Sequence, residues 1–131
     1  MKSVQKVSLP SDVSVIATYR CQMRCKMCNI WKFPTDEKKE IKPGDLEKLS
    51  PLKFVNVTGG EPFQRRDLDD LVAVLFKKAP RVVISTSGWH YDRIVDLARK
   101  FPEIGIRVSI EGLSETNDGS ILLFASGPLV V

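Results

Sequence analysis

The stretch FVNVTGGEPFQRRDLDDLVAVLFKKAPRVVI, residues 54–84, combines two hydrophobic patterns in one segment. Its ends, residues 54–57 and 82–84, are short runs rich in β-branched residues, which are typical of buried strands. Between them, residues 67–78 predict an amphipathic helix with Asp67 as its candidate cap. The apolar stripe of this helix consists of Leu68, Leu71, Val72 and Leu75. A strand, a helix and a second strand in this order predict a parallel pair joined by a right-handed crossover.

The same unit recurs on both sides of this stretch. Residues 13–17 and 106–110 predict two more strands, and residues 43–49 and 91–101 predict two more helices. The fold class is therefore α/β, with about four parallel strands and three helices. A closed eight-stranded barrel requires about 250 residues, so a chain of 131 residues can form only part of one.

The composition is that of one soluble globular domain. The chain is 43% apolar and 27% charged, and its 20 basic and 16 acidic residues are interspersed, which disfavours a nucleic-acid-binding patch. No stretch approaches the roughly 20 apolar residues of a membrane span, and residues 1–12 contain no apolar run. The three closely spaced cysteines do not form a disulfide framework and indicate a reducing compartment. We therefore expect a cytoplasmic protein that does not bind membranes.

Unusual residues follow each predicted strand. In parallel sheets and barrels the loops after the strands share one rim, where ligands bind. We therefore expect one site assembled from four loops. These loops contain Cys21, Cys25 and Cys28 after the first strand, Thr58-Gly59-Gly60-Glu61-Pro62 after the second, residues 85–90 after the third, and residues 109–112 at the end of the fourth.

The cysteines have the spacing C-x3-C-x2-C, which allows them to converge on one metal centre. Thiolates select zinc, copper(I) or iron-sulfur clusters. A structural zinc site requires a fourth ligand, for which His90 is the only histidine in the chain. A cubane 4Fe-4S cluster usually takes four cysteines, so three cysteines leave one iron open to an external ligand.

The segment after the second strand has the groups that an amino-acid ligand requires. Gly59 and Gly60 allow the backbone to approach a ligand closely, because they carry no Cβ. Glu61 offers a carboxylate to a cationic ammonium group. The segment therefore predicts a binding site for an ammonium group beside the metal centre.

The cysteine spacing joined to Gly59-Gly60-Glu61-Pro62 resembles the radical S-adenosylmethionine enzymes. Residues 109–112 and 115–118, with the sequences SIEG and ETND, look like the fourth-strand segment of the members related to the molybdenum-cofactor cyclase and the SPASM-type peptide maturases. The resemblance covers residues 13–118 and implies a partial (β/α) barrel.

This resemblance implies a 4Fe-4S cluster held by Cys21, Cys25 and Cys28, with S-adenosylmethionine on the fourth iron. An electron from the reduced cluster cleaves the sulfonium and leaves a 5'-deoxyadenosyl radical, which abstracts hydrogen from a substrate. The substrate is not evident from the sequence. A flavodoxin or a ferredoxin is the implied electron donor.

The resemblance also implies roles for the other loops. Gly59, Gly60 and Glu61 would bind the methionine ammonium group. The family's ribose and carboxylate contacts correspond to Thr86, Ser87, Ser109 and Glu111. Two positions depart from the family pattern: Met27 replaces an aromatic residue that contacts adenine, and Ser87 replaces an asparagine.

The chain also departs from the family in its extent. Residues 13–118 correspond to the N-terminal portion of the core domain, residues 1–12 precede it, and residues 119–131 form an apolar tail without a charged residue. We therefore expect a truncated fragment with about four of six strands. Two alternatives to an active enzyme remain: a catalytically incompetent fragment that only binds the cluster, and a structural zinc-binding module.

Overall fold

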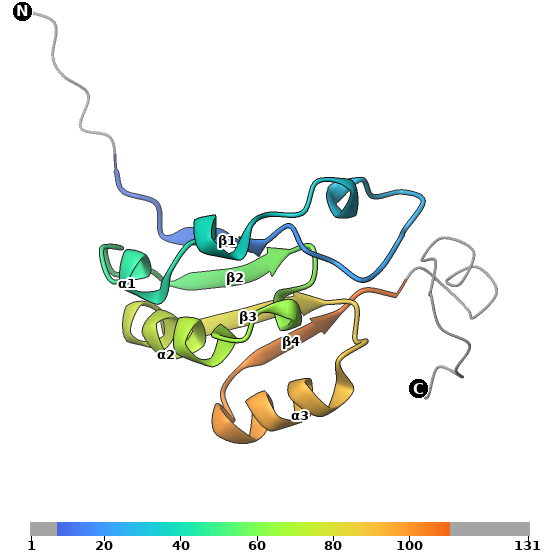
Figure 1. The fold of residues 1–131 in the computed structure, drawn as a ribbon. Coiled ribbons are helices and arrows are strands. Elements are labelled where there is room, and N and C mark those ends of the chain that lie inside the picture. Colours follow the sequence, from blue (N-terminus) through green and yellow to red (C-terminus); the bar gives the residue numbers. More distant parts are fainter. Residues whose placement is uncertain (1–7, 111–131) are drawn as a thin grey trace, which may run out of the picture.

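The computed structural model describes residues 8–110, which form a four-stranded parallel sheet with helices on one side (Figure 1). The strands are β1 (Asp12–Thr18), β2 (Phe54–Gly59), β3 (Arg81–Thr86) and β4 (Gly105–Val108), and they lie in the sheet in this order. Each strand pairs in parallel with the next one along the chain. The predicted α/β class and the parallel order are confirmed.

Three α-helices connect the strands: α1 (Pro43–Leu46), α2 (Leu68–Lys78) and α3 (Tyr91–Lys100). Three short 3-10 helices lie in the loops: η1 (Ile30–Lys32), η2 (Glu37–Lys39) and η3 (Pro62–Gln64). The prediction that the first helix spans residues 43–49 was too long. After Leu46 the backbone continues only as turns, in which Lys48 N donates to Asp45 O and Leu49 N to Leu46 O.

The fourth strand also ends earlier than predicted, at Val108 instead of residue 110. Its last paired residue lies beside Thr86, where β3 itself ends, and Ser109 N donates the final bond to Thr86 O over 2.9 Å. Beyond Thr86 the third strand turns through Gly88, whose φ is +83°. β4 therefore ends because its neighbour no longer offers a partner.

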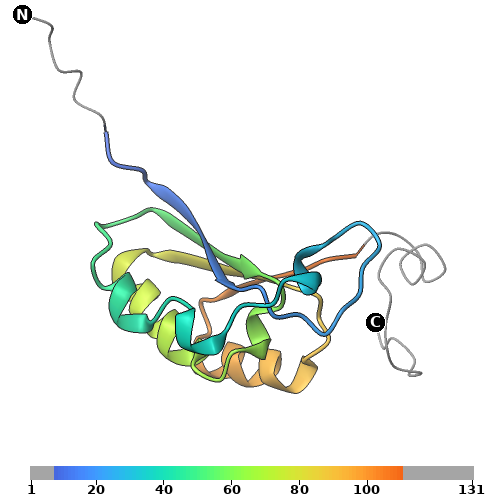
Figure 2. The ribbon, with the colours of Figure 1, turned by 45° about the horizontal axis from the view of Figure 1, so that its top comes forward.

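The hydrophobic core lies between one face of the sheet and the helices (Figure 2). The predicted stripe of α2 is confirmed, because all four of its residues are fully buried. Each such side chain contributes roughly 1.5–3 kcal/mol through removal from water. On the sheet, the core residues without exposed surface are Val55, Val57, Val82 and Ile84.

The opposite face of the sheet is not covered by a helix in residues 8–110 (Figure 2). Strand register places Ser14 beside Asn56 and Ser85 beside Arg107 on this face, while the apolar Ile16 lies beside Thr58 and Val83 beside Asn56. Ser85 Oγ donates to Asn56 Oδ1 over 3.0 Å. Parallel sheets are normally buried on both faces by apolar side chains. This face therefore carries several polar side chains, in contrast to the apolar face that packs on the helices.

Candidate functional site

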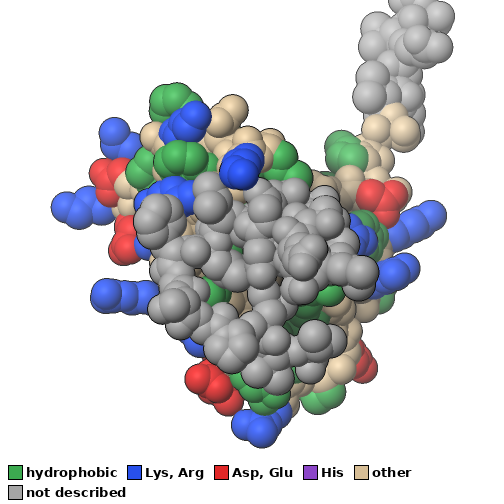
Figure 3. Space-filling model, turned by 90° about the vertical axis from the view of Figure 1, so that its right-hand side faces the viewer, with side chains coloured by type: hydrophobic (Ala, Val, Ile, Leu, Met, Phe, Trp, Pro, Cys, Tyr) green, Lys and Arg blue, Asp and Glu red, His purple; other side chains and the backbone are tan. Residues whose placement is uncertain are grey.

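The loops after β1, β2 and β3 meet at one end of the sheet, as the rim argument predicted (Figure 1). Figure 3 looks onto this end of the molecule, and Lys and Arg side chains around its margin alternate with Asp and Glu. The described margin therefore has mixed charge, in agreement with the interspersed charges of the sequence.

The Gly-Gly segment holds the cysteine loop, residues 21–34, against the end of β2. Gly60 N donates to Thr18 O over 2.7 Å, and Glu61 N donates to Arg20 O over 2.9 Å. A Cβ at Gly60 would lie 2.3 Å from Arg20 O. Gly59 has φ +148°, and a Cβ there would lie 2.2 Å from Thr18 O. Both glycines are therefore required by the neighbouring backbone, whereas the sequence argument gave only a ligand as the reason.

The three cysteines form no disulfide with one another and are half-buried in the loop between β1 and η1. Cys28 N donates to Cys25 O over 3.2 Å, which closes a turn between the last two. Arg24 Nη1 donates to Cys21 O over 2.9 Å, and its guanidinium carbon lies 4.9 Å from the centre of the Trp31 ring. Burial raises the pKa of the Cys21 thiol, and the nearby Glu61 carboxylate adds to this effect.

Glu61 joins the loops after β2 and β3. Its side chain is fully buried. Oε1 accepts bonds from Thr86 Oγ1 at 2.8 Å and Phe63 N at 3.2 Å. Oε2 accepts bonds from Ser87 N at 2.8 Å and Ser87 Oγ at 2.6 Å. A carboxylate offers about four lone-pair sites, so these four donors occupy all of them.

Three predicted site residues, Glu61, Thr86 and Ser87, are thus brought together, although they bind one another. A ligand ammonium group can reach the Glu61 carboxylate only if a present donor leaves. The Ser87 hydroxyl is the most easily displaced, because it rotates about a single bond. Ser109 is exposed at the end of β4, and Glu111 lies outside the described residues.

We expect Glu61→Gln to lower the free energy of unfolding by about 1–3 kcal/mol. The glutamine NH2 group is a donor, and it would face Ser87 or Thr86 where a carboxylate oxygen now accepts their hydrogen bonds. At least one buried donor would therefore lose its bond. Urea unfolding followed by circular dichroism measures this loss. Glu47→Gln is the matched control, because Glu47 is exposed, and equal stability of the two variants would contradict the expectation.

A buried ionic cluster that the sequence argument did not foresee lies beside the cysteine loop. Glu40 is 7% exposed and Arg65 only 1%. Arg20 donates to both Glu40 oxygens, over 2.9 and 3.0 Å, and Arg65 Nη1 lies 3.5 Å from Glu40 Oε2. Asp67, predicted as the cap of α2, makes no capping bond with its side chain. Its carboxylate accepts two bonds from Arg65.

The Glu40 carboxyl titrates far below its usual range. Burial acts to raise its pKa, but hydrogen bonds from Arg20, Thr18 and Thr35 outweigh burial and lower the pKa to about 2. Each pKa unit corresponds to about 1.4 kcal/mol, so ionised Glu40 contributes about 3 kcal/mol to stability. Because the folded-state pKa is the lower one, this contribution is complete above about pH 5 and is lost as the pH falls toward 2.

We therefore expect the free energy of unfolding to decrease between about pH 5 and pH 2 in the wild type and to decrease less in Glu40→Gln. Asp67 also has a lowered pKa, chiefly because Arg65 donates to it, and it titrates in both proteins. The difference between the two pH profiles, measured by urea unfolding, thus belongs to Glu40. Parallel profiles would contradict the assignment.

Comparisons with known proteins agree with this geometry. The family model described as "Radical SAM superfamily" matches residues 15–125. The chain belongs to the radical SAM superfamily. It is 34% identical over 112 residues to the Fe-coproporphyrin III synthase of Methanosarcina barkeri. This match covers 77% of this chain and 27% of that protein. The chain is also 30% identical over 112 residues to the GTP 3',8-cyclase of Helicobacter pylori. This match covers 77% of this chain and 35% of that protein.

A solved structure with the same fold is Streptococcus suis SuiB bound to S-adenosylmethionine. It superposes with a TM-score of 0.72 at 19% identity, over 87% of this chain and 28% of that chain. The resemblance to the radical SAM family and its partial (β/α) barrel is therefore confirmed. The chain spans about a third of the length of the curated relatives that it matches.

The donor set of this radical SAM chain is suited to an iron-sulfur cluster. Three thiols lie in one loop at the rim, beside the Gly59-Gly60 segment that packs on the start of this loop. Among residues 8–110, no three or more His, Cys, Asp or Glu side chains are arranged to hold a metal ion. Binding of one metal centre by all three thiols would therefore require them to move closer together.

His90, the fourth ligand of the zinc alternative, has a different neighbour. Its Nε2 lies 3.3 Å from Gln64 Nε2, which also donates to Gln22 Oε1 over 2.9 Å. Burial lowers the pKa of His90, which favours the neutral ring. In the described part of the chain His90 thus belongs to a polar group with two glutamines.

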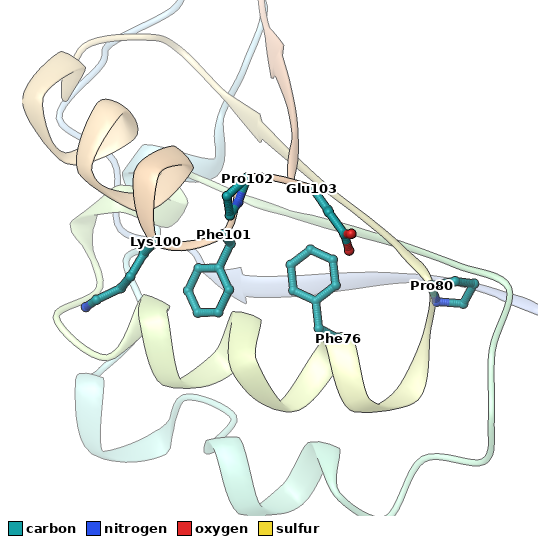
Figure 4. A pocket seen from close by; sticks show the side chains of 6 residues that line it. All are labelled: Phe76, Pro80, Lys100, Phe101, Pro102 and Glu103. Atoms are coloured by element: carbon teal, nitrogen blue, oxygen red, sulfur yellow. The ribbon is translucent and has the colours of Figure 1, made fainter.

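A cavity of about 440 Å³ lies away from the rim, between α2 and the segment after α3 (Figure 4). The rings of Phe76 and Phe101 face each other across 5.8 Å in this cavity. Pro80, Pro102, Lys100 and Glu103 complete its wall. None of the predicted site residues lines it, so it is not part of the candidate site.

None of the helices between residues 8 and 110 has the length and apolar character needed to cross a lipid bilayer.

Proposed function

We propose that this chain carries the cluster-binding and methionine-binding part of a radical SAM enzyme that cleaves S-adenosylmethionine reductively. The single observation that carries this proposal is the bond between Glu61 N and Arg20 O, 2.9 Å long. It holds the Gly-Gly-Glu segment directly against the start of the loop that contains all three cysteines. A metal-binding loop and an amino-acid-binding segment are therefore adjacent.

In this proposal Cys21, Cys25 and Cys28 hold a 4Fe-4S cluster. When bound and reduced, the cluster supplies the electron that splits S-adenosylmethionine into methionine and a 5'-deoxyadenosyl radical. Gly59 and Gly60 present backbone groups to the methionine part. Glu61 accepts the ammonium group in place of the Ser87 hydroxyl, and Thr86, Ser87, Ser109 and Glu111 serve the ribose and the carboxylate.

In this proposal the substrate lies over the uncovered face of the sheet. Ser14, Asn56, Ser85 and Arg107 lie on the face that no helix of the described chain covers. A substrate held over this face would present its hydrogen atom near the rim where the radical forms. The electron donor is a flavodoxin or ferredoxin in the cytoplasm, where free thiols remain reduced.

Anaerobic reconstitution with iron and sulfide tests the proposal. We expect four irons and four sulfides per chain, an absorption spectrum and reduced-state electron paramagnetic resonance of a 4Fe-4S cluster, and binding of S-adenosylmethionine. Reduction with dithionite should then yield 5'-deoxyadenosine. A chain that takes up no iron, or one that purifies with stoichiometric zinc, would overturn the proposal.

The second candidate is a chain that binds the cluster but is catalytically incompetent. The observation in its favour is the extent of the chain, which spans 27% and 35% of two curated relatives. A reconstituted cluster with no 5'-deoxyadenosine after reduction would favour this candidate over the active enzyme.

A further inference from the structure

We propose that Glu40 is a positioning residue that closes the neck of the cysteine loop and so prepares the three thiols for the cluster. The neck consists of Thr18 and Arg20, which precede Cys21, and Thr35 and Glu40, which follow the loop. This inference rests on the proposed function, because it concerns assembly of the same metal centre.

The residues before Cys21 are attached to Glu40 by side chain and backbone. Arg20 donates through Nε to Oε1 over 2.9 Å and through Nη2 to Oε2 over 3.0 Å. Thr18 Oγ1 donates to Oε1 over 2.5 Å and accepts from Arg20 N over 3.0 Å. A paired guanidinium-carboxylate contact fixes direction as well as distance. The backbone that enters the cysteine loop is therefore held in one orientation.

Thr35 forms the second attachment. Its Oγ1 donates to Glu40 Oε1 over 2.6 Å and accepts from Tyr19 N over 3.0 Å. One hydroxyl thus links the backbone that enters the loop to the carboxylate that follows it. Residues 21–34 are closed into a ring by these bonds.

Arg65 connects the neck to the sheet and to the loop after β2. Its Nη1 donates to Ala17 O over 2.7 Å, and its Nη2 donates to Ile41 O over 2.9 Å. Arg93 of α3 donates in turn to Arg65 O over 2.7 Å. The neck therefore has a fixed position relative to the segment that contains Gly60 and Glu61.

The charges of the neck explain why a carboxylate stands at its centre. Arg20 and Arg65 bring two positive charges to Glu40, while Glu37 and Asp67 each bind one of the two guanidinium groups on its outer side. Replacing the central carboxylate leaves two guanidinium groups close together and partly buried, which is unfavourable. A neutral residue of the same shape therefore does not hold the neck in the same way.

A closed neck lowers the cost of assembling the cluster. A loop with free ends loses conformational entropy when its thiols gather on one centre, and closure in advance removes part of that loss from the binding step. Residues outside the ligand set that orient a metal site typically affect metal affinity on the order of 10- to 100-fold. We expect an effect of this size from Glu40.

The test compares Glu40→Gln with Glu37→Gln after anaerobic reconstitution of the full chain. Glu37 also binds Arg20 but is exposed, with 61% of its side-chain surface accessible, so its variant is the matched control. We expect Glu40→Gln to lose iron to a chelator about 10- to 100-fold faster than the wild type, with an altered resonance spectrum of the reduced cluster. Glu37→Gln should match the wild type.

A second variant keeps the test valid if Glu40→Gln does not fold. Thr35→Val keeps the shape of the side chain and all charges but removes the hydroxyl bonds to Glu40, Tyr19 N and Thr18, and we expect about 10-fold faster iron loss. Circular dichroism of the iron-free proteins identifies any variant that does not fold. Wild-type rates in both Glu40→Gln and Thr35→Val would overturn the positioning role alone. A wild-type chain that takes up no cluster would overturn this role together with the proposed function.

Discussion

Replacing any one of Cys21, Cys25 and Cys28 by alanine is expected to abolish the cluster. With two thiolates in place of three, two irons of the cube lack a protein ligand, and such a cluster is open to loss in solution. The iron content after anaerobic reconstitution should therefore fall from about four per chain toward zero. S-adenosylmethionine cleavage should be lost with it, because the electron no longer has a source.

Lys26→Ala is the control for the cysteine variants. Lys26 lies between Cys25 and Cys28 and is exposed, so its substitution tests whether any change in the loop is harmful. We expect normal iron content in this variant. A cysteine variant that keeps a full cluster would show that the cluster is held by other residues.

Replacing Gly60 by alanine should have a large effect on stability. The new Cβ would lie 2.3 Å from Arg20 O and 2.9 Å from Tyr19 O, both backbone atoms that cannot rotate away. Relief requires the cysteine loop to separate from β2, which breaks the bonds from Gly60 N and Glu61 N. We expect a loss of about 3 kcal/mol in the free energy of unfolding, from overpacking and the broken bonds together.

Gly44→Ala is the matched control. Gly44 lies in α1 with no atom within 4 Å of the position of a Cβ, and alanine in a helix is about 0.5–1 kcal/mol more favourable than glycine. The free energy of unfolding, measured with urea, should therefore decrease in Gly60→Ala and increase in Gly44→Ala. Equal effects would mean that the contact with Arg20 O is not tight in solution. Gly60→Ala should also take up less iron, because the start of the cysteine loop moves.

The order of strands and helices follows from the sequence, because hydrophobic periodicity records which face of each element is buried. Leu68, Leu71 and Leu75 lie on one side of α2 for that reason, and all are buried. The ends of elements depend on neighbours. α1 stops at Leu46 because turn bonds follow it, and β4 stops at Val108 because β3 ends beside it. The local hydrophobic pattern carries no information on either cause.

The sequence identifies candidate site residues where the chemistry depends on residue type and spacing. The three cysteines and Gly59-Gly60-Glu61 are such residues, and the structure places their loops side by side. The role of Glu40 was not predictable, since its partners Thr18, Arg20 and Arg65 lie more than 19 positions away in the chain. In the sequence, Glu40 and the two arginines look like ordinary charged surface residues. Such long-range pairs become visible only in three dimensions.

The two faces of the sheet allow this scaffold to diversify. Stability comes from the face that packs on the helices, whereas Ser14, Asn56 and Arg107 project from the other face and contribute little to the core. Substitutions at distant sites without shared contacts have nearly independent effects. Residues on the uncovered face can therefore be exchanged one by one with little effect on the packed side of the fold.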